Sequence, residues 1–192
     1  ATNTAIPPTA TNTAIPPTAT PTGTCPNVAG GYCRTDTETR TWIAGTTNQS
    51  ITGDDATKTV TLPFTFRFAG TNYTSVKISS NGNVHFSTAS TAYNNVAIPA
   101  STRPNAMIAA LWDDLNPSGG GIYTATSGAA PNRVFVIEWR NVYRYGVSAS
   151  AATFQIQLVE TTNHIWVVYQ DTDFGSTTYN YGLSATSGVE NS

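Results

Sequence analysis

Hydrophobic and polar residues alternate over long stretches of this chain. The clearest alternation spans residues 59–68, where an apolar side chain stands at every second position from Val60 to Phe68. A period of two places one face of a β-strand in the core and the other in solvent. Pro63 lies within this strand and has no N–H to donate, so we expect the strand at a sheet edge or at a bulge.

Several further segments also indicate β-strands. The dipeptide Asn81-Gly82 separates two alternating stretches, residues 76–80 and 83–87, and predicts a hairpin with a type I′ turn, in which both central residues have positive φ. Residues 107–112 (MIAALW) are continuously apolar, as in a strand buried on both faces. A loop at 116–121 then precedes Ile122-Tyr123, and later strands are expected at 133–143, 152–159, 164–169 and within 179–185. The pattern predicts an all-β fold, an antiparallel β-sandwich of jelly-roll type with about eight to ten strands.

The first 22 residues follow a different pattern. The unit ATNTAIPPT occurs twice and is followed by ATPT. Its prolines predict an extended polyproline II tail, which we assign to residues 1–24. With about three residues per turn, Ile6 and Ile15 return to the same face of the tail, about 28 Å apart. We therefore predict that both isoleucines anchor the tail on neighbouring subunits of a homopolymer, an extracellular filament or fibre; the alternative is a passive linker or stalk.

Threonine is the other main residue of the tail. Threonines flanked by Ala and Pro, without charges, are typical of O-glycosylated stalks, and the candidates here are Thr2, Thr4, Thr9, Thr11, Thr13, Thr18, Thr20 and Thr22. Asn48 and Asn72 each begin an N-x-S/T motif and are candidate N-glycosylation sites. Covalent glycans are therefore expected partners.

Composition restricts the remaining possibilities. Charged residues make up 10% of the chain and the net charge is −2, which argues against a nucleic-acid or anionic-membrane partner. No apolar segment approaches the ~20 residues of a membrane span. Cys25 and Cys33 are the only cysteines; since His85 and His164 lie far along the chain, a disulfide closing residues 25–33 is predicted rather than a zinc site. The sandwich domain would then cover residues 34–192 of a secreted or cell-surface protein.

Candidate chemistry is sparse. Asp113 and Asp114 precede a glycine-rich loop and are weak candidates for Ca²⁺ ligands; the alternative is that they cap loop N–H groups or pair with an arginine such as Arg140. No other cofactor is expected. There is no G-x-S-x-G motif, and both histidines lie in predicted strands, so no enzymatic activity is predicted. Four tyrosines could stack on sugar rings or form cross-strand pairs: Tyr143, Tyr145, Tyr179 and Tyr181.

The order of the motifs resembles a known family. The segments are VTLPFTFRFAGTNYTSVKISSNGNVHF, PNAMIAALWDDLNP, GGGIYTAT, RVFVIEWRNV, FQIQLVE and HIWVVYQDT. From about Val60 to Glu190 the chain is similar to the nidogen-type extracellular domain, and more closely to related β-sandwich modules of bacterial secreted proteins. The best markers are Ser80-Asn81-Gly82 and Trp112-Asp113-Asp114. The resemblance implies an extracellular adhesion or scaffold module without enzymatic activity. A carbohydrate-binding or adhesion module on a passive glycosylated stalk is the alternative to the filament subunit.

Overall fold

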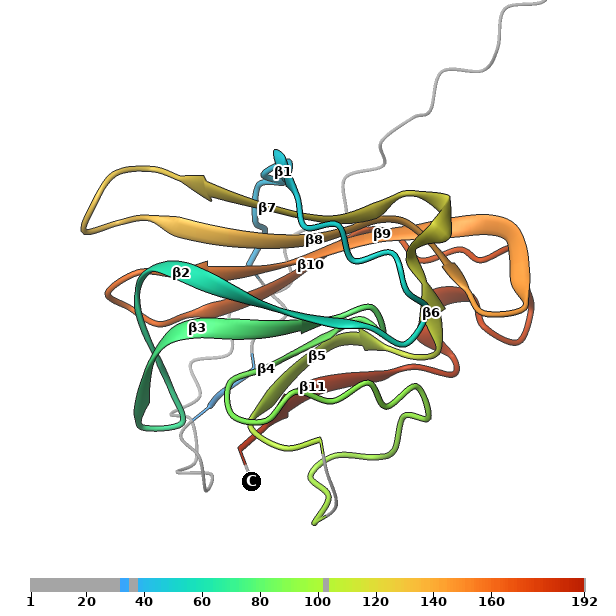
Figure 1. Ribbon diagram of the computed structural model, residues 1–192, viewed down its shortest axis with the longest axis horizontal. Helices are drawn as coiled ribbons and strands as arrows, with labels where there is room; N and C mark the ends of the chain where they lie inside the picture. Colours follow the sequence, from blue (N-terminus) through green and yellow to red (C-terminus); the bar gives the residue numbers. More distant parts are fainter. Residues whose placement is uncertain (1–31, 35–37, 102–103, 192) are drawn as a thin grey trace, which may run out of the picture.

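The fold is a β-sandwich. The computed structural model describes residues 32–34, 38–101 and 104–191. Within these ranges eleven strands form two antiparallel sheets, which occupy the upper and lower halves of the view in Figure 1. The helical segments of the same ranges are two short 3₁₀ turns, η1 (Pro117–Gly119) and η2 (Asn180–Gly182). The all-β antiparallel sandwich predicted from the sequence is confirmed.

The first sheet, sheet A, has the strand order β1-β7-β8-β9-β10, and β6 also pairs with β8. Its long strands follow one another as hairpins, with Ile137 opposite Thr124 on one side and Ile156 on the other. The bounds are β1 Thr47–Asn48, β6 Leu115–Asn116, β7 Gly121–Ser127, β8 Val134–Arg144, β9 Val147–Val159 and β10 Ile165–Asp171.

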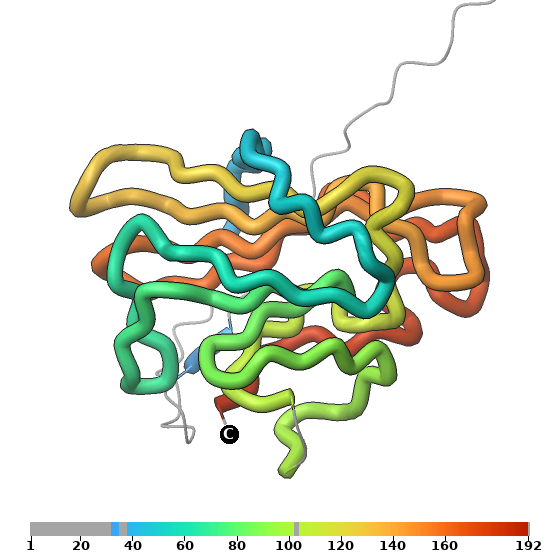
Figure 2. The backbone as a smooth tube through the Cα atoms, viewed as in Figure 1, coloured from blue at the N-terminus to red at the C-terminus, as the bar shows by residue number. Residues whose placement is uncertain are grey.

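The second sheet, sheet B, has the order β11-β5-β4-β3-β2. Its bounds are β2 Thr57–Phe68, β3 Thr71–Ser79, β4 Asn83–His85, β5 Met107–Trp112 and β11 Thr186–Glu190. Four strands in each sheet follow one another as hairpins, β2 to β5 in sheet B and β7 to β10 in sheet A, as the backbone trace in Figure 2 shows, whereas β1 and β11 are crossover strands that pair with β7 and β5. β11 returns from the end of sheet A to pair with β5.

The core lies between the two sheets. Phe66 and Phe68 of β2 are completely buried, and the ring of Phe68 stacks on Phe86 with centroids 4.2 Å apart. On the side of sheet A, the indole of Trp139 in β8 stacks on the ring of Phe154 in β9, with centroids 5.1 Å apart. Both positions expected for Pro63 are confirmed. Its strand β2 is an edge strand, and the pairing of β2 with β3 shifts register between Thr61 and Phe66, as at a bulge.

Three local predictions were wrong. The last strand is Thr186–Glu190, and residues 179–185 instead contain η2, in which Tyr181 has φ 58°. Residues 116–121 are not only a loop, since β6 and η1 occupy most of them. The β3–β4 hairpin exists, but Ile78 pairs with Val84 and only Gly82 of the central dipeptide has a positive φ, of 74°. The turn is therefore not type I′.

Candidate functional site

An extended segment, residues 41–45, crosses the outer face of sheet A. Gln157 Nε2 donates to the Thr41 carbonyl at 2.9 Å, and Gln155 both donates to and accepts from the backbone of Ile43 at 3.4 Å. These glutamines are completely or almost completely buried. The backbones of Thr41 and Ile43 are thus attached to β9, because the two glutamines repeat with the strand period of two.

The segment ends at an ion pair. Glu138 of β8 is 1% exposed, and its carboxylate accepts from the Gly45 N–H at 2.5 Å and from Arg140 Nε at 2.6 Å. Arg140 Nη2 donates both to Glu138 at 3.0 Å and to the Gly45 carbonyl at 2.8 Å. Its guanidinium also lies 4.1 Å from the ring centroid of Tyr123. Hydrogen bonding to Glu138 raises the pKa of Arg140.

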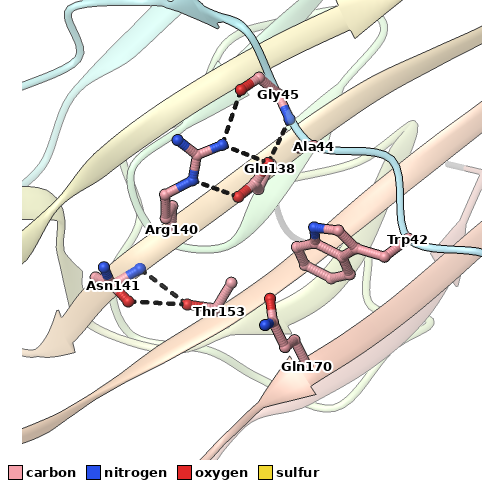
Figure 3. Close-up of a pocket in the computed structure, with 8 residues that line it drawn as sticks. All are labelled: Trp42, Ala44, Gly45, Glu138, Arg140, Asn141, Thr153 and Gln170. Atoms are coloured by element: carbon pink, nitrogen blue, oxygen red, sulfur yellow. Dashed lines mark hydrogen bonds and ion pairs between the residues drawn. The ribbon is translucent and has the colours of Figure 1, made fainter. Parts of the chain in front are cut away.

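Beside this ion pair lies a groove of about 490 Å³, which we call the tryptophan groove. Its lining residues are Trp42, Ala44, Gly45, Glu138, Arg140, Asn141, Thr153 and Gln170. Figure 3 shows Trp42 on one side, Arg140 and Asn141 on the other and Gln170 along one rim. Thr153 Oγ1 accepts from the Asn141 backbone N–H at 3.0 Å and donates to the Asn141 side chain at 3.2 Å. The groove combines one aromatic face with several planar polar groups.

A second groove, of about 320 Å³, lies near the edge strands β10 and β11, and we call it the tyrosine groove. Its lining residues are Arg34, Leu111, Tyr169, Thr172, Tyr181, Gly182, Ala185 and Ser187. The Tyr169 hydroxyl donates to the Ala110 carbonyl at 2.5 Å and lies 3.0 Å from Ser187 Oγ, and burial raises its pKa. Tyr181 is 74% exposed and the neighbouring Leu183 is 72% exposed. Two large apolar side chains are therefore exposed at this groove or next to it in the chain.

The four tyrosines singled out from the sequence do not share one platform. Tyr181 lines the tyrosine groove. Tyr179 packs under Arg144, whose guanidinium lies 4.5 Å from its ring centroid. Tyr145 is 55% exposed beside the end of β8, and Tyr143 lies on β8 opposite Asn116. The sequence did not single out Trp42, because its neighbours show no strand alternation and only the folded sheet brings it to Gln170.

Asp113 and Asp114 are held by protein groups. Asp113 is 2% exposed; its carboxylate accepts from the Asp114 N–H at 2.8 Å and from the Ser184 hydroxyl. Arg144 Nε lies 3.2 Å from Asp113, as an ion pair without hydrogen-bond geometry, and Arg144 Nη1 donates to Asp114 at 3.3 Å. The arginine that pairs with these two aspartates is thus Arg144, whereas Arg140, the example given from the sequence, pairs with Glu138. Burial raises the pKa of Asp114, and Arg144 opposes this shift. The described residues contain no cluster of three or more His, Cys, Asp or Glu suited to a metal ion.

The first marker of the family resemblance contacts the residues that flank the second. Asn81 is completely buried, and its Oδ1 accepts from the Leu115 N–H at 2.9 Å, directly after Trp112-Asp113-Asp114. Gly82 offers its carbonyl to the N–H groups of Ala110 and Leu111 at 3.0 and 3.1 Å. These contacts join the β3–β4 turn to the end of β5, so the markers form a structural junction.

The remaining candidates are dispersed. His85 is completely buried in sheet B, and burial, with Lys77 as the next cause, lowers its pKa to about 4. His164 is exposed just before β10, with its ring 6.4 Å from Trp166. Asn48 on β1 and Asn72 on β3 are exposed, and their glycosylation stays a prediction.

The rest of the predicted sites cannot be compared with the structure. The tail threonines, Ile6, Ile15 and Cys25 lie outside the described residues. The disulfide between Cys25 and Cys33 therefore stays a prediction as well.

Comparison with known proteins gives a family match. Within the described part of the chain, none of the helical segments has the length and apolar character needed to cross a membrane. No curated protein and no solved structure matches the chain. A family model described as NIDO related matches residues 32–192, which include both grooves and the junction of the two markers. The chain therefore belongs to the nidogen-related family.

Proposed function

We propose that this protein is a structural subunit of an extracellular filament or fibre, in which the N-terminal tail of one subunit docks in the tyrosine groove of the next. The observation that carries the proposal is the exposure of Tyr181 and Leu183, 74% and 72%, beside that groove. Large apolar side chains gathered at an exposed groove are typical of a protein interaction site. Membership of the nidogen-related family supports an extracellular, non-enzymatic module.

The chemistry of the tyrosine groove suits a proline-rich segment. Polyproline II segments bind to grooves lined by aromatic side chains, since they are already extended and lose little entropy. Tyr169 and Tyr181 supply the aromatic walls, and Leu111 and Ala185 supply aliphatic surface. The hydroxyl of Tyr169 is held by Ala110 and Ser187, which fixes the ring before any ligand arrives. Ile6 or Ile15, each followed by two prolines, is the expected occupant.

The position of the groove supports contact between subunits. Arg34, one of the first residues that the structure describes, lines the groove. A polyproline II tail of 22 residues spans about 68 Å, whereas a domain of this size is roughly 40 Å across. The tail can therefore reach past its own domain to a neighbour. Head-to-tail contacts of this kind do not close into a ring unless the rotation allows it, and otherwise produce helical fibres.

The expected energy per contact is moderate. Burial of one isoleucine side chain contributes about 1.5–3 kcal/mol. Because Ile6 and Ile15 lie about 28 Å apart, they occupy the grooves of two different neighbours, and the two contacts of one tail together contribute roughly 3–6 kcal/mol. Each 1.4 kcal/mol is tenfold in affinity. Removal of both anchors should thus weaken subunit association by roughly two to four orders of magnitude.

The test is electron microscopy and sedimentation of the full-length, natively modified chain. We expect fibres from the wild type and dispersed particles from the double variant Ile6→Asn/Ile15→Asn and from Tyr181→Ser. Tyr145→Ser is the matched control, since Tyr145 is also exposed but lies outside the groove, and it should keep the fibres. Monodisperse wild-type particles, or fibres that survive the isoleucine changes, would refute the proposal.

The tryptophan groove favours a second candidate function. Its single aromatic ring stands among several convergent polar side chains, which favours a polar small ligand such as a sugar. The protein would then be a secreted adhesion or carbohydrate-binding module carried on a passive glycosylated stalk. Ligand binding by a wild type that does not polymerise would support this second function over the filament.

A further inference from the structure

We propose that the tryptophan groove is a binding site for a neutral saccharide, and that it binds this ligand without hydrolysing it. The site lies on the outer face of sheet A and shares no lining residue with the tyrosine groove. It does not depend on polymerisation, and it gives a ligand class to the second function considered above.

The aromatic part of the site is Trp42. The indole is partly exposed, and Figure 3 shows it across from Arg140 and Asn141. A pyranose ring has an apolar face of C–H groups, and this face packs well against a flat aromatic ring that excludes water from it. The other tryptophans of sheet A are differently placed. Trp139 is buried in the core, and Trp166 is covered by the guanidinium of Arg40 at 4.4 Å.

The polar part of the site matches sugar hydroxyls. Gln170 of β10 and Asn141 of β8 present side-chain amides, which offer a donor and an acceptor in one plane. Three polar groups of the groove make no hydrogen bond to the protein within the described residues. They are the side-chain amide of Gln170, Nδ2 of Asn141 and Nη1 of Arg140. Adjacent hydroxyls of a sugar ring can each donate and accept, so they can satisfy these groups together.

The charge of the site favours an uncharged ligand. The charged residues that line it are Arg140 and Glu138, which neutralise each other with contacts of 2.6 and 3.0 Å. A phosphate or carboxylate would have to compete with Glu138 for the guanidinium. A neutral hydroxyl only needs the donor that remains on Nη1, so it avoids this cost.

The same ion pair argues against hydrolysis. A glycosidase needs two carboxyl groups on either side of the bond that is broken, and Glu138 is the one carboxylate in the lining of the groove. Both of its oxygens already accept hydrogen bonds, from Arg140 and from the Gly45 N–H. Glu138 is therefore a positioning residue, because it holds the segment 41–45 that carries Trp42.

The groove is formed before ligand binding. The contacts from Gln155, Gln157 and Glu138 attach residues 41–45 to the sheet at three successive alternate positions. A side chain at position 45 could not fit, because its Cβ would lie 2.5 Å from Tyr123 Cβ. Little conformational entropy is then lost on binding, which favours affinity in a shallow site.

The proposal is tested with the full-length chain by tryptophan fluorescence and calorimetric titration against neutral oligosaccharides of glucose, mannose and galactose. A second arm uses the tail glycopeptide, residues 1–22 released with its native modifications, and the same peptide synthesised without sugar. Both measurements work whether or not the sample polymerises, so failure of the filament and failure of the saccharide site are distinguishable.

We expect saturable binding of a free oligosaccharide, of the glycopeptide, or of both, and the arm that responds identifies the source of the sugar. Trp42→Ala should weaken binding by at least about tenfold, equivalent to ~1.4 kcal/mol. Gln170→Ala should weaken it less, and Trp166→Phe, a tryptophan on the same face outside the groove, should leave it unchanged. Absence of binding in every arm, equal binding of the sugar-free peptide, or equal losses for the Trp42 and Trp166 variants would overturn the proposal.

Discussion

Asn81 offers the sharpest test of how the sandwich is stabilised. Its side chain is completely buried, with Oδ1 accepting from the Leu115 N–H at 2.9 Å and Nδ2 donating to Asp55 at 2.8 Å. Replacement by alanine leaves the Leu115 N–H buried without this partner, which costs about 1–3 kcal/mol. Loss of the bond to the Asp55 carboxylate adds about 1.5 kcal/mol, at the low end of the range for charged partners because Asp55 is exposed.

Together these losses predict that Asn81→Ala lowers the free energy of unfolding by roughly 2.5–4.5 kcal/mol, a large part of the ~5–15 kcal/mol that typical domains possess. Equilibrium urea unfolding, followed by circular dichroism and by tryptophan fluorescence, measures this change. Asn72→Ala is the control, since Asn72 is exposed on β3, and it should change stability by less than about 0.5 kcal/mol. A loss for Asn81→Ala as small as that of the control would refute the reasoning.

Asn81→Asp separates the two bonds. The aspartate can still accept from the Leu115 N–H, but its second oxygen then faces Asp55 in place of the amide donor. Repulsion and burial should raise the pKa of this new carboxyl in the folded state above its unfolded value. The folded state then binds the proton more tightly, so the variant should lose stability as pH rises from about 4 to 7. A pH-independent difference from wild type would contradict this account.

Three further predictions concern other contacts. Gly82→Ala should destabilise by roughly 2–5 kcal/mol in the same assay, because a Cβ would lie 2.1 Å from the Leu111 carbonyl oxygen at a residue with φ 74°; a neutral effect would mean that the turn can move. Burial lowers the pKa of His85 from 6.5 to about 4, so stability should fall by up to roughly 3 kcal/mol as pH drops through that window, and His85→Gln should remove this dependence. The hydrogen bond from Arg133 lowers the pKa of Glu160 from 4.5 to about 2, so the stability difference between wild type and Glu160→Gln should be present above pH 4.5 and vanish near pH 2; an unchanged difference at low pH would count against the pair.

The strands could largely be located from the sequence. The alternation from Val60 to Phe68 and the apolar segment at 107–112 predicted β2 and β5, because the period of a strand is a local property of the backbone. The prediction failed at residues 179–185, where a last strand was expected. There the chain forms a 3₁₀ turn with Tyr181 at positive φ, a conformation that alternation does not encode.

The candidate sites were much less predictable. Trp42 lies in a segment without alternation, and it meets Asn141 and Gln170 only because β8, β9 and β10 pair side by side. Glu138 and Arg140 stand two residues apart on β8, so the strand period places both side chains on one face and favours their ion pair. The partner of Asp113 is Arg144, which lies far along the chain, and only the pairing of β6 with the end of β8 brings it close.

The sequence by itself determined that this chain is an all-β sandwich with a repeated proline-rich tail, since hydrophobic period, turn residues and proline content act over a few neighbouring residues. Only the tertiary structure decided which residues share a groove. Contacts such as that between Gln157 and Thr41 join positions 116 residues apart. Such contacts depend on the order and register of whole strands, and these are set by the packing of the entire core.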